Sequence, residues 1–344
     1  MLQQTTVAAV RPAFERFLTR FPNVAALAAA EEAVVLRHWE GLGYYRRARQ
    51  LHAAAQAIVA EHGGRFPTQV AAIHALPGIG RYTSGAIASI AFDLPAPILE
   101  ANTIRLWARL LGETRDVAQR DVVERLWRTA TDVLPADGGS GLLNQALMDL
   151  GSQVCLPREP LCLLCPVSSL CSARKVGKVA EIPLAAKKTA WTIQHDVALI
   201  IRRAEKVLLV RYAPGARWAG MWDTPRATAS LGQPIPQAAK YPIDFIAEFF
   251  NESLGITATV GEHLGRLNHV VTRYKITLDV YEASIPSRAK PKLAGPKYLE
   301  FAWVKRDDLA DLPMSTTVRR SFRAGSLNRA KVLSVRRCDF RPLP

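Results

Sequence analysis

Two different hydrophobic periods divide this chain. Up to about residue 173, apolar side chains recur every three or four positions, which is typical of helices that bury one face. The clearest stretches are Val10, Phe14, Phe17, Leu18 and Phe21, and later Ala86, Ile87, Ile90 and Ala91. We therefore predict an all-α domain over residues 1–173.

From about residue 194 the period shortens towards two, as in strands with one buried face. The alternation is clearest at Val197, Leu199 and Ile201, and again at Ile276, Leu278 and Val280. Residues 202–206 can turn and 207–210 form an apolar run, so a hairpin is expected there. Residues 245–254 fit a helix between strands. This pattern predicts an α+β domain over residues 194–344.

Basic residues mark the segment between these domains and the end of the chain. Residues 174–193 combine Pro183 with alanines and lysines, including Lys187 and Lys188, which is typical of a linker. The last 26 residues contain one acid, Asp339, and eight basic residues: Arg319, Arg320, Arg323, Arg329, Lys331, Arg336, Arg337 and Arg341. We expect a solvated basic tail, with DNA contact as the alternative.

Composition narrows the kind of partner. The chain has 344 residues, 49% of them hydrophobic, and a net charge of +15. Such a basic excess favours a polyanionic partner, most simply nucleic acid. No apolar run reaches the length of a membrane span, so no membrane partner is expected. Reduced cysteines and no export signal predict a cytoplasmic, nucleoid-associated protein.

Four cysteines lie close together in residues 155–171. They are Cys155, Cys162, Cys165 and Cys171, spaced C-x6-C-x2-C-x5-C, with the fifth, Cys338, far away. Soft thiolate ligands select zinc or an iron–sulfur cluster. Zinc ribbons usually combine two C-x2-C pairs, and only one is present here. A disulfide framework fits poorly in so long a chain without a secretory signal.

A glycine-rich turn precedes the helical pattern at residues 81–92. In Leu76–Thr83, Gly78 and Gly80 let backbone N–H groups approach a phosphate, and Thr83 is a candidate helix cap. The N-terminus of the next helix adds free donors and partial positive charge. Residues 76–92 therefore fit a helix-hairpin-helix, with Gly78, Gly80 and Arg81 as DNA-contact candidates. A simple helix connection is the alternative.

Five segments together resemble the MutY-type adenine DNA glycosylases of the endonuclease III superfamily. They are MLQQT at 1–5, WEGLGYY at 39–45, LPGIGRYT at 76–83, NQALMDLG at 144–151, and the cysteine loop. The resemblance implies a helix-hairpin-helix glycosylase domain whose four cysteines hold a 4Fe–4S cluster. It also implies a monomer that acts on double-stranded DNA containing adenine opposite 8-oxoguanine.

The reaction requires a flipped base, a proton for the leaving adenine and a carboxylate to stabilise the sugar cation. The family's carboxylate lies in a Pro-x-x-Asp-Gly-Asn segment, which here is Pro97–Asn102, so Glu100 takes the aspartate's place. Asn102 is its expected companion, as a helix cap or a donor. Endonuclease III-like lyases carry a lysine where this chain has Tyr82. Because tyrosine cannot form an imine, base removal without strand cleavage is expected.

The family's acid lies two residues before the MLQQT run, which here begins at Met1. We expect a start codon assigned too late rather than a true loss of the acid. Gln4, Leu42 and Tyr44 match family residues that enter or wedge the DNA stack, and core packing is the alternative for each.

The second domain resembles the family's Nudix-like domain, through residues 195–210 and 217–225. Only Glu252 sits where a magnesium ligand would be, so a binding module is expected rather than a hydrolase. The family reads 8-oxoguanine with a Phe-Ser-His loop, which here is Val271-Thr272-Arg273. Thr272 can supply a hydroxyl, and Arg273 can contact a phosphate or a purine.

Two hypotheses follow. The first is a monofunctional glycosylase that hydrolyses the bond to adenine opposite 8-oxoguanine or guanine. The second is a lesion-DNA binding protein of the same fold with impaired catalysis, supported by Glu100 and by the lack of the family's acid in the sequence as given. A lyase is disfavoured by Tyr82.

Overall fold

The chain forms two compact units, and one of them combines distant parts of the sequence. Met1–His52 joins Thr189–Arg336 in one unit, and Ala53–Lys188 forms the body of the other. The computed structural model describes residues 1–3, 5–184, 190–229, 243–255, 257–293 and 296–324. Within these ranges, no helix has both the length and the apolar character needed to cross a membrane.

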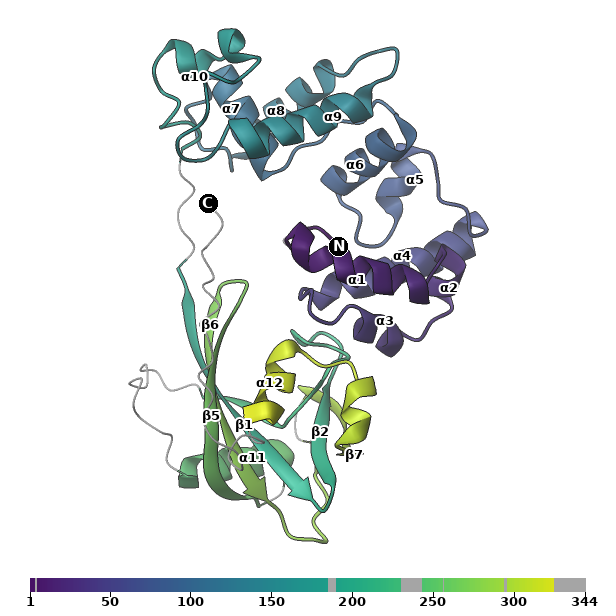
Figure 1. Ribbon diagram of the computed structural model, residues 1–344, viewed down its shortest axis with the longest axis vertical. Helices are drawn as coiled ribbons and strands as arrows, with labels where there is room; N and C mark the ends of the chain where they lie inside the picture. The colour runs from purple at the N-terminus through teal and green to yellow at the C-terminus, as the bar shows by residue number, and fades with distance from the viewer. Residues whose placement is uncertain (4, 185–189, 230–242, 256, 294–295, 325–344) are drawn as a thin grey trace. The chain divides into compact units, whose positions relative to one another are not determined.

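Helices make up the first half of the chain, as its hydrophobic period predicted (Figure 1). In order they are α1 (Val7–Arg20), α2 (Val24–Ala28), α3 (Glu32–His38), α4 (Tyr45–His62), α5 (Val70–Ala75), α6 (Arg81–Phe92), α7 (Ala101–Leu111), α8 (Arg120–Asp132), α9 (Ser140–Asp149) and α10 (Ser172–Lys175). One core joins α7, α8 and α9 through Leu106, Trp107, Leu126 and Leu147.

Helix α6 packs closely against its neighbours because two glycines, one in α6 and one in α9, let the backbones approach each other. A Cβ at Gly85 of α6 would overlap the carbonyl oxygen of Pro97, and one at Gly141 of α9 would overlap that of Ser89. Asn144 of α9 adds two hydrogen bonds of 2.9 Å, to the Ser89 hydroxyl and the Ala96 carbonyl. These contacts fix the segment that leads into α7.

The second half is a mixed sheet with helices packed on it (Figure 1). Its elements are β1 (Thr192–Arg203), β2 (Lys206–Tyr212), β3 (Trp222–Asp223), β4 (Arg226–Ala229), α11 (Ile243–Leu254), β5 (Thr259–Val271), β6 (Tyr274–Ser284), β7 (Tyr298–Lys305) and α12 (Thr316–Ala324). The strand order is β3-β2-β1-β6-β5, with β4 on β1 and β7 on β2. The predicted β1–β2 hairpin and the helix at α11 are confirmed.

The central strand β1 is buried on both faces, which explains its apolar run. One core contains Val197, Leu199 and Ile201 with Ile246 and Phe250 of α11. Another contains Ala198, Ile200, Leu278 and Val280, with Phe322 of α12 packed against it. Alternate side chains of β1 therefore contact different helices, as a period of two requires.

Parts of the segments predicted as linker and tail belong to the folded structure. Ile182, in the segment expected as a linker, is 2% exposed and packs with Ala108 and Ala173. Arg319, Arg320 and Arg323 lie on the helix α12 and not in a tail; Arg320 and Arg323 are exposed, as expected, whereas Arg319 is half-buried. The other five basic residues of the tail, and Lys187 and Lys188, lie outside the described residues.

Candidate active site

Glu100 lies at the N-terminus of α7, as the Pro97–Asn102 pattern predicted. Its carboxylate accepts a hydrogen bond of 3.0 Å from the Thr103 amide, and the Thr103 hydroxyl accepts one of 2.8 Å from the Glu100 amide. This reciprocal capping box holds the side chain against the helix start, where a negative charge is favoured. The alternative of Asn102 as the helix cap is wrong, because Glu100 takes that position.

Tyr82, on α6, lies close enough to Glu100 for their charges to interact. Burial raises the pKa of the Tyr82 phenol, and the nearby Glu100 raises it further. The phenol is therefore neutral at physiological pH and keeps its O–H as a donor. The carboxylate of Glu100 and the neutral hydroxyl of Tyr82 thus lie within electrostatic range of each other.

The glycine turn before α6 is shaped by Gly78, whose φ of +76° favours glycine. The N-cap of α6 is Gly80 and not Thr83, which corrects the predicted cap, because the helix already begins at Arg81. A Cβ at Gly80 would meet nothing within 4 Å, so packing within the protein does not explain this glycine. The Arg81 side chain pairs with Glu124 at 3.0 Å and lies 4.1 Å from the Trp127 ring centre.

The three candidate DNA-stack residues differ in their surroundings. Gln4 lies outside the described residues. Leu42 is 5% exposed, in agreement with core packing, whereas Tyr44 is 45% exposed. Tyr44 also has a φ of +48°, a strained conformation for a residue other than glycine. Of Leu42 and Tyr44, Tyr44 is therefore the one that can contact DNA without leaving the protein core.

Cys155, Cys162, Cys165 and Cys171 line a common cavity, together with Leu106, Arg109 and six other residues. The cavity encloses about 360 Å³, part of it open to solvent. The four thiols are free. Within the described ranges, no three His, Cys, Asp or Glu side chains are arranged to hold a metal ion. The cysteines therefore share a space without converging on one point.

Two arginines of α7, which the sequence analysis missed, connect Glu100's helix to the cysteine loop. Arg105 donates to Asn102 Oδ1 (3.0 Å) and to the Gly151 and Cys155 carbonyls (2.6 and 2.8 Å). Arg109 donates to Cys155 Sγ (3.3 Å) and to three carbonyls, those of Leu156, Pro157 and Ile182. Because residues four apart lie on the same face of a helix, two arginines with this spacing predict an exposed face. Nothing in the local sequence indicates that they are buried.

The predicted lesion-reading residues form the two-residue turn between β5 and β6. Val271 pairs with Tyr274, so Thr272 and Arg273 make the turn, and Thr272 has a φ of +54°. Sequence analysis did not single out Tyr274, whose ring lies 3.9 Å from the Arg217 guanidinium. A hydrogen bond from Arg273 lowers the pKa of the Tyr274 phenol. An aromatic ring therefore lies beside the turn, although not at position 271.

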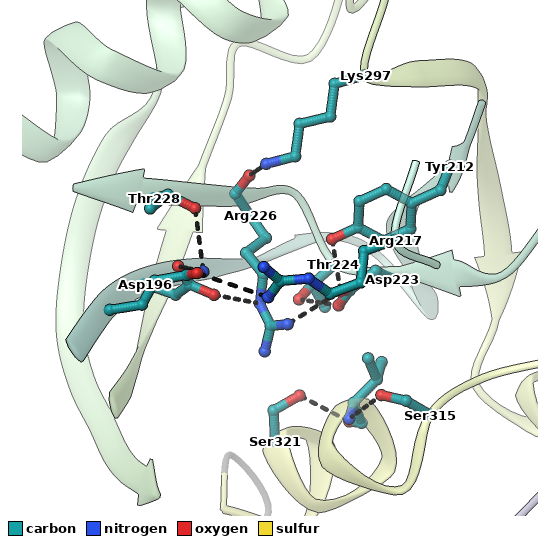
Figure 2. A network of polar contacts seen from close by, with 12 residues as sticks. Asp196, Tyr212, Arg217, Asp223, Thr224, Arg226, Thr228, Lys297, Ser315 and Ser321 are labelled. Atoms are coloured by element: carbon teal, nitrogen blue, oxygen red, sulfur yellow. Dashed lines mark hydrogen bonds and ion pairs between the residues drawn. The ribbon is translucent and has the colours of Figure 1, made fainter. Parts of the chain in front are cut away.

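Two of the carboxylates buried in the sheet domain, those of Asp196 and Asp223, lie near Arg226 (Figure 2). Arg226 lies 3.7 Å from carboxylate oxygens of both Asp196 and Asp223. Tyr212 donates to Asp223 at 3.0 Å, and burial raises the pKa of Asp223. Lys297 donates to the Arg226 carbonyl at 2.6 Å. Glu252, the one residue predicted to match a magnesium ligand, is exposed on α11, whereas the carboxylates of this network are buried.

Comparison with known proteins agrees with both halves of this architecture. Residues 1–131 match the family model described as HhH-GPD superfamily base excision DNA repair protein, and residues 196–324 match the NUDIX domain. An adenine DNA glycosylase from Rattus norvegicus is 30% identical over 370 residues, which cover 94% of this chain and 69% of the relative.

Two further relatives carry the same name. The adenine DNA glycosylase of Buchnera aphidicola subsp. Schizaphis graminum is 39% identical over 225 residues, 65% of each chain. That of Schizosaccharomyces pombe is 28% identical over 97% of this chain and 80% of its own. With a helix-hairpin-helix domain followed by a Nudix domain, the chain belongs to the MutY-type adenine DNA glycosylases of base excision repair.

Proposed function

We propose that this protein hydrolyses the N-glycosidic bond of adenine opposite 8-oxoguanine or guanine in duplex DNA, without cutting the strand. The observation that carries the proposal is the Glu100 carboxylate, held by a capping box at the start of α7 beside the neutral phenol of Tyr82. A fixed anion at that place suits stabilisation of a sugar cation. Tyr82 offers a hydroxyl where a lyase needs an amine.

DNA contact is assigned to the turn before α6. The left-handed backbone at Gly78 and the open space at Gly80 support close approach of a phosphate to the amides at the helix start. Arg81 contributes positive charge there, although Glu124 partly neutralises it. Such contacts position the duplex and do not select the lesion.

Lesion reading is assigned to Thr272 and Arg273. The turn is exposed, and the ring of Tyr274 lies between two arginines, 3.9 Å from Arg217 and 5.4 Å from Arg273. A hydroxyl, a guanidinium and an aromatic ring are the groups that bind and stack on a purine.

The four loop cysteines are proposed to hold a 4Fe–4S cluster. All four line one cavity, as the ligands of a single inorganic group would, and four thiolates are the usual ligand set of such a cluster. Arg109 is 2% exposed and hydrogen-bonded to carbonyls and to Cys155 Sγ, so a negatively charged thiolate cluster would balance its charge. The cluster would fix the 155–171 loop; the residues of α6 and α7 carry the base-removal chemistry.

The test is adenine release from a duplex with adenine opposite 8-oxoguanine. The assay compares the 344-residue chain with an extended chain that carries a glutamate two residues before Met1. Glu100→Gln should lower the single-turnover rate by about 100-fold or more, since the cation loses its counter-charge. Arg128→Ala, an exposed change, is the control. No release from the extended chain, or full activity of Glu100→Gln, would refute the proposal.

A lesion-binding protein with impaired catalysis is the second candidate. It is favoured by the longer side chain at position 100, whose carboxylate is engaged by the Thr103 amide. This candidate predicts tight, salt-sensitive binding to the lesion duplex with no adenine release from either version of the chain.

A further inference from the structure

The segment that carries Tyr44 is attached to the sheet domain by charged and polar contacts. Both belong to the same compact unit, although about 270 residues separate the partners Tyr45 and Met314. The contacts come from residues 37–49 on one side and from residues 309–319, with Ala219, on the other.

Glu40 and Arg319 are the centre of this attachment. Arg319 of α12 binds both carboxylate oxygens of Glu40, one through Nε and the other through Nη2 at 2.8 Å. The remaining donors of Arg319 reach the carbonyls of Leu309 (3.0 Å) and Leu312 (2.9 Å). Only 14% of the Glu40 side chain and 24% of that of Arg319 are exposed. A two-point pair of this kind fixes orientation as well as distance.

Three further side chains make contacts around the pair. Arg37 donates to Glu40 at 3.3 Å and to the Ala310 carbonyl at 2.5 Å. On the other side of the loop, Tyr45 donates to the Met314 carbonyl at 3.3 Å, and Arg49 donates to that of Ala219 at 2.6 Å. The chain is therefore held to the sheet domain both before and after residues 41–44.

The loop between these attachments has a strained backbone. Gly41, Gly43 and Tyr44 all have positive φ, at +93°, +67° and +48°. Trp39 donates its indole N–H to the Gly43 carbonyl at 3.0 Å, inside the loop. A tyrosine in this conformation persists only where its surroundings impose it. The surroundings here include the sheet domain, and the side chain that results is the exposed Tyr44.

We propose that Glu40 and Arg319 are positioning residues: through them the Nudix-like domain sets the conformation of the 40–44 loop and so the place of Tyr44 at the DNA stack. The inference rests on the proposed function for its role on DNA. It predicts that the domain that reads the lesion also controls the residue that opens the strand.

The first test needs no DNA. Amide hydrogen exchange of the free protein is measured for Arg319→Ala, Glu40→Ala and the double variant, with Arg323→Ala as the control that removes the same charge from the same helix. Exchange at residues 40–45 should rise about tenfold in Arg319→Ala and in Glu40→Ala. In the double variant it should rise by clearly less than the two effects combined, because the Glu40–Arg319 pair is lost in all three. Unchanged exchange in Arg319→Ala, or additive effects, would overturn the proposal.

The second test uses 2-aminopurine in place of the target adenine opposite 8-oxoguanine, so that fluorescence reports unstacking without chemistry. At saturating protein, Arg319→Ala should give about a tenfold smaller rise than wild type or Arg323→Ala. On a duplex already opened by flanking mismatches, the variant should match wild type. An equal loss on both duplexes would mean general damage and would overturn the positioning role.

The two tests separate the inference from the function it rests on. If wild type leaves 2-aminopurine stacked while Arg319→Ala loosens the loop, the proposed function fails and the attachment stands. If wild type unstacks the base and Arg319→Ala does so equally, the attachment plays no part in opening DNA and the inference fails.

Discussion

The helical unit and the sheet domain each bury an arginine, and they satisfy it in opposite ways. Arg109 gives its N–H groups to three carbonyls and to Cys155 Sγ, at 2.6 to 3.3 Å. Arg226 has two carboxylates near it, both at 3.7 Å, and its Nε and Nη2 have no hydrogen-bond partner among the described residues. One is held by directed bonds to the backbone, the other mainly by charge.

This difference indicates which part of the structure depends on each arginine. Carbonyls are fixed by the course of the chain, so a cation bound to those of residues 156, 157 and 182 determines how that part of the chain folds around the cysteines. Carboxylates belong to replaceable side chains, so the group around Arg226 can be exchanged as a set. A buried ion pair of this kind is weak support for stability in itself.

The largest expected effect is that of Arg109→Ala. The substitution removes the donor from three carbonyls, of which that of Ile182 belongs to a buried residue, and leaves a space in the core, so it should cost about 3–5 kcal/mol of unfolding free energy. The same variant should hold less iron, because the loop that presents Cys155 loses its support. Urea unfolding and iron content per chain measure both effects. Arg128→Ala, on the exposed face of α8, should change stability by less than about 0.5 kcal/mol. A stable, iron-replete Arg109→Ala protein would contradict this account.

A smaller effect is expected at Arg226, and it should be reversible. Arg226→Met alone removes the guanidinium that lies 3.7 Å from Asp196 and Asp223, leaves Lys297 as the remaining nearby cation, and should cost about 3 kcal/mol. Adding Asp196→Asn and Asp223→Asn should recover at least half of that loss, because the charges are then removed as a set. If the triple variant is as unstable as the single one, Arg226 makes directed bonds after all, and the contrast with Arg109 disappears.

The sequence predicted elements that depend on local pattern. The strands β1, β2 and β6 and the helix α11 follow from periodicity, and Glu100 was placed at a helix start by the Pro97–Asn102 segment and the helical pattern after it. Arg109 and Arg319 were missed or misplaced because their partners, Ile182 and Glu40, lie 73 and 279 residues away. An arginine on a helix fits solvent by default, and only tertiary structure shows which ones are buried.

The predicted cap at Thr83 failed for a local reason. Threonine is a good N-cap residue, but the helix begins two residues earlier, directly after Gly80, and its N-cap makes no side-chain hydrogen bond. Glycine is also accepted at N-caps, so the pattern allowed a cap at Gly80 as well as at Thr83, and the structure places it at Gly80.

The smallest expected effect is a difference in pH dependence between the two regions. In the helical unit, the Arg115 guanidinium lowers the pKa of Glu113 to about 2. Its stabilisation is therefore complete above the ordinary pKa of 4.5 and is lost as pH falls towards 2. In the sheet domain, burial lowers the pKa of His269 to about 4, with Arg226 adding to the effect and Asp196 opposing it.

His269 should therefore respond first on acidification. The unfolded chain takes up a proton at the ordinary histidine pKa of 6.5, whereas the folded protein resists until about pH 4, so stability falls between these values. His269→Gln should reduce the loss of unfolding free energy between pH 6.5 and 4.5 by about 1 kcal/mol. The effect is this small because Arg217 and Arg320, which also lower the pKa of this imidazole, are exposed and screened by solvent. Glu113→Gln should change the curve only below pH 4.5. If both substitutions change stability over the same pH range, the two regions respond to pH alike. The contrast between them is then limited to the hydrogen-bond geometry of their buried arginines.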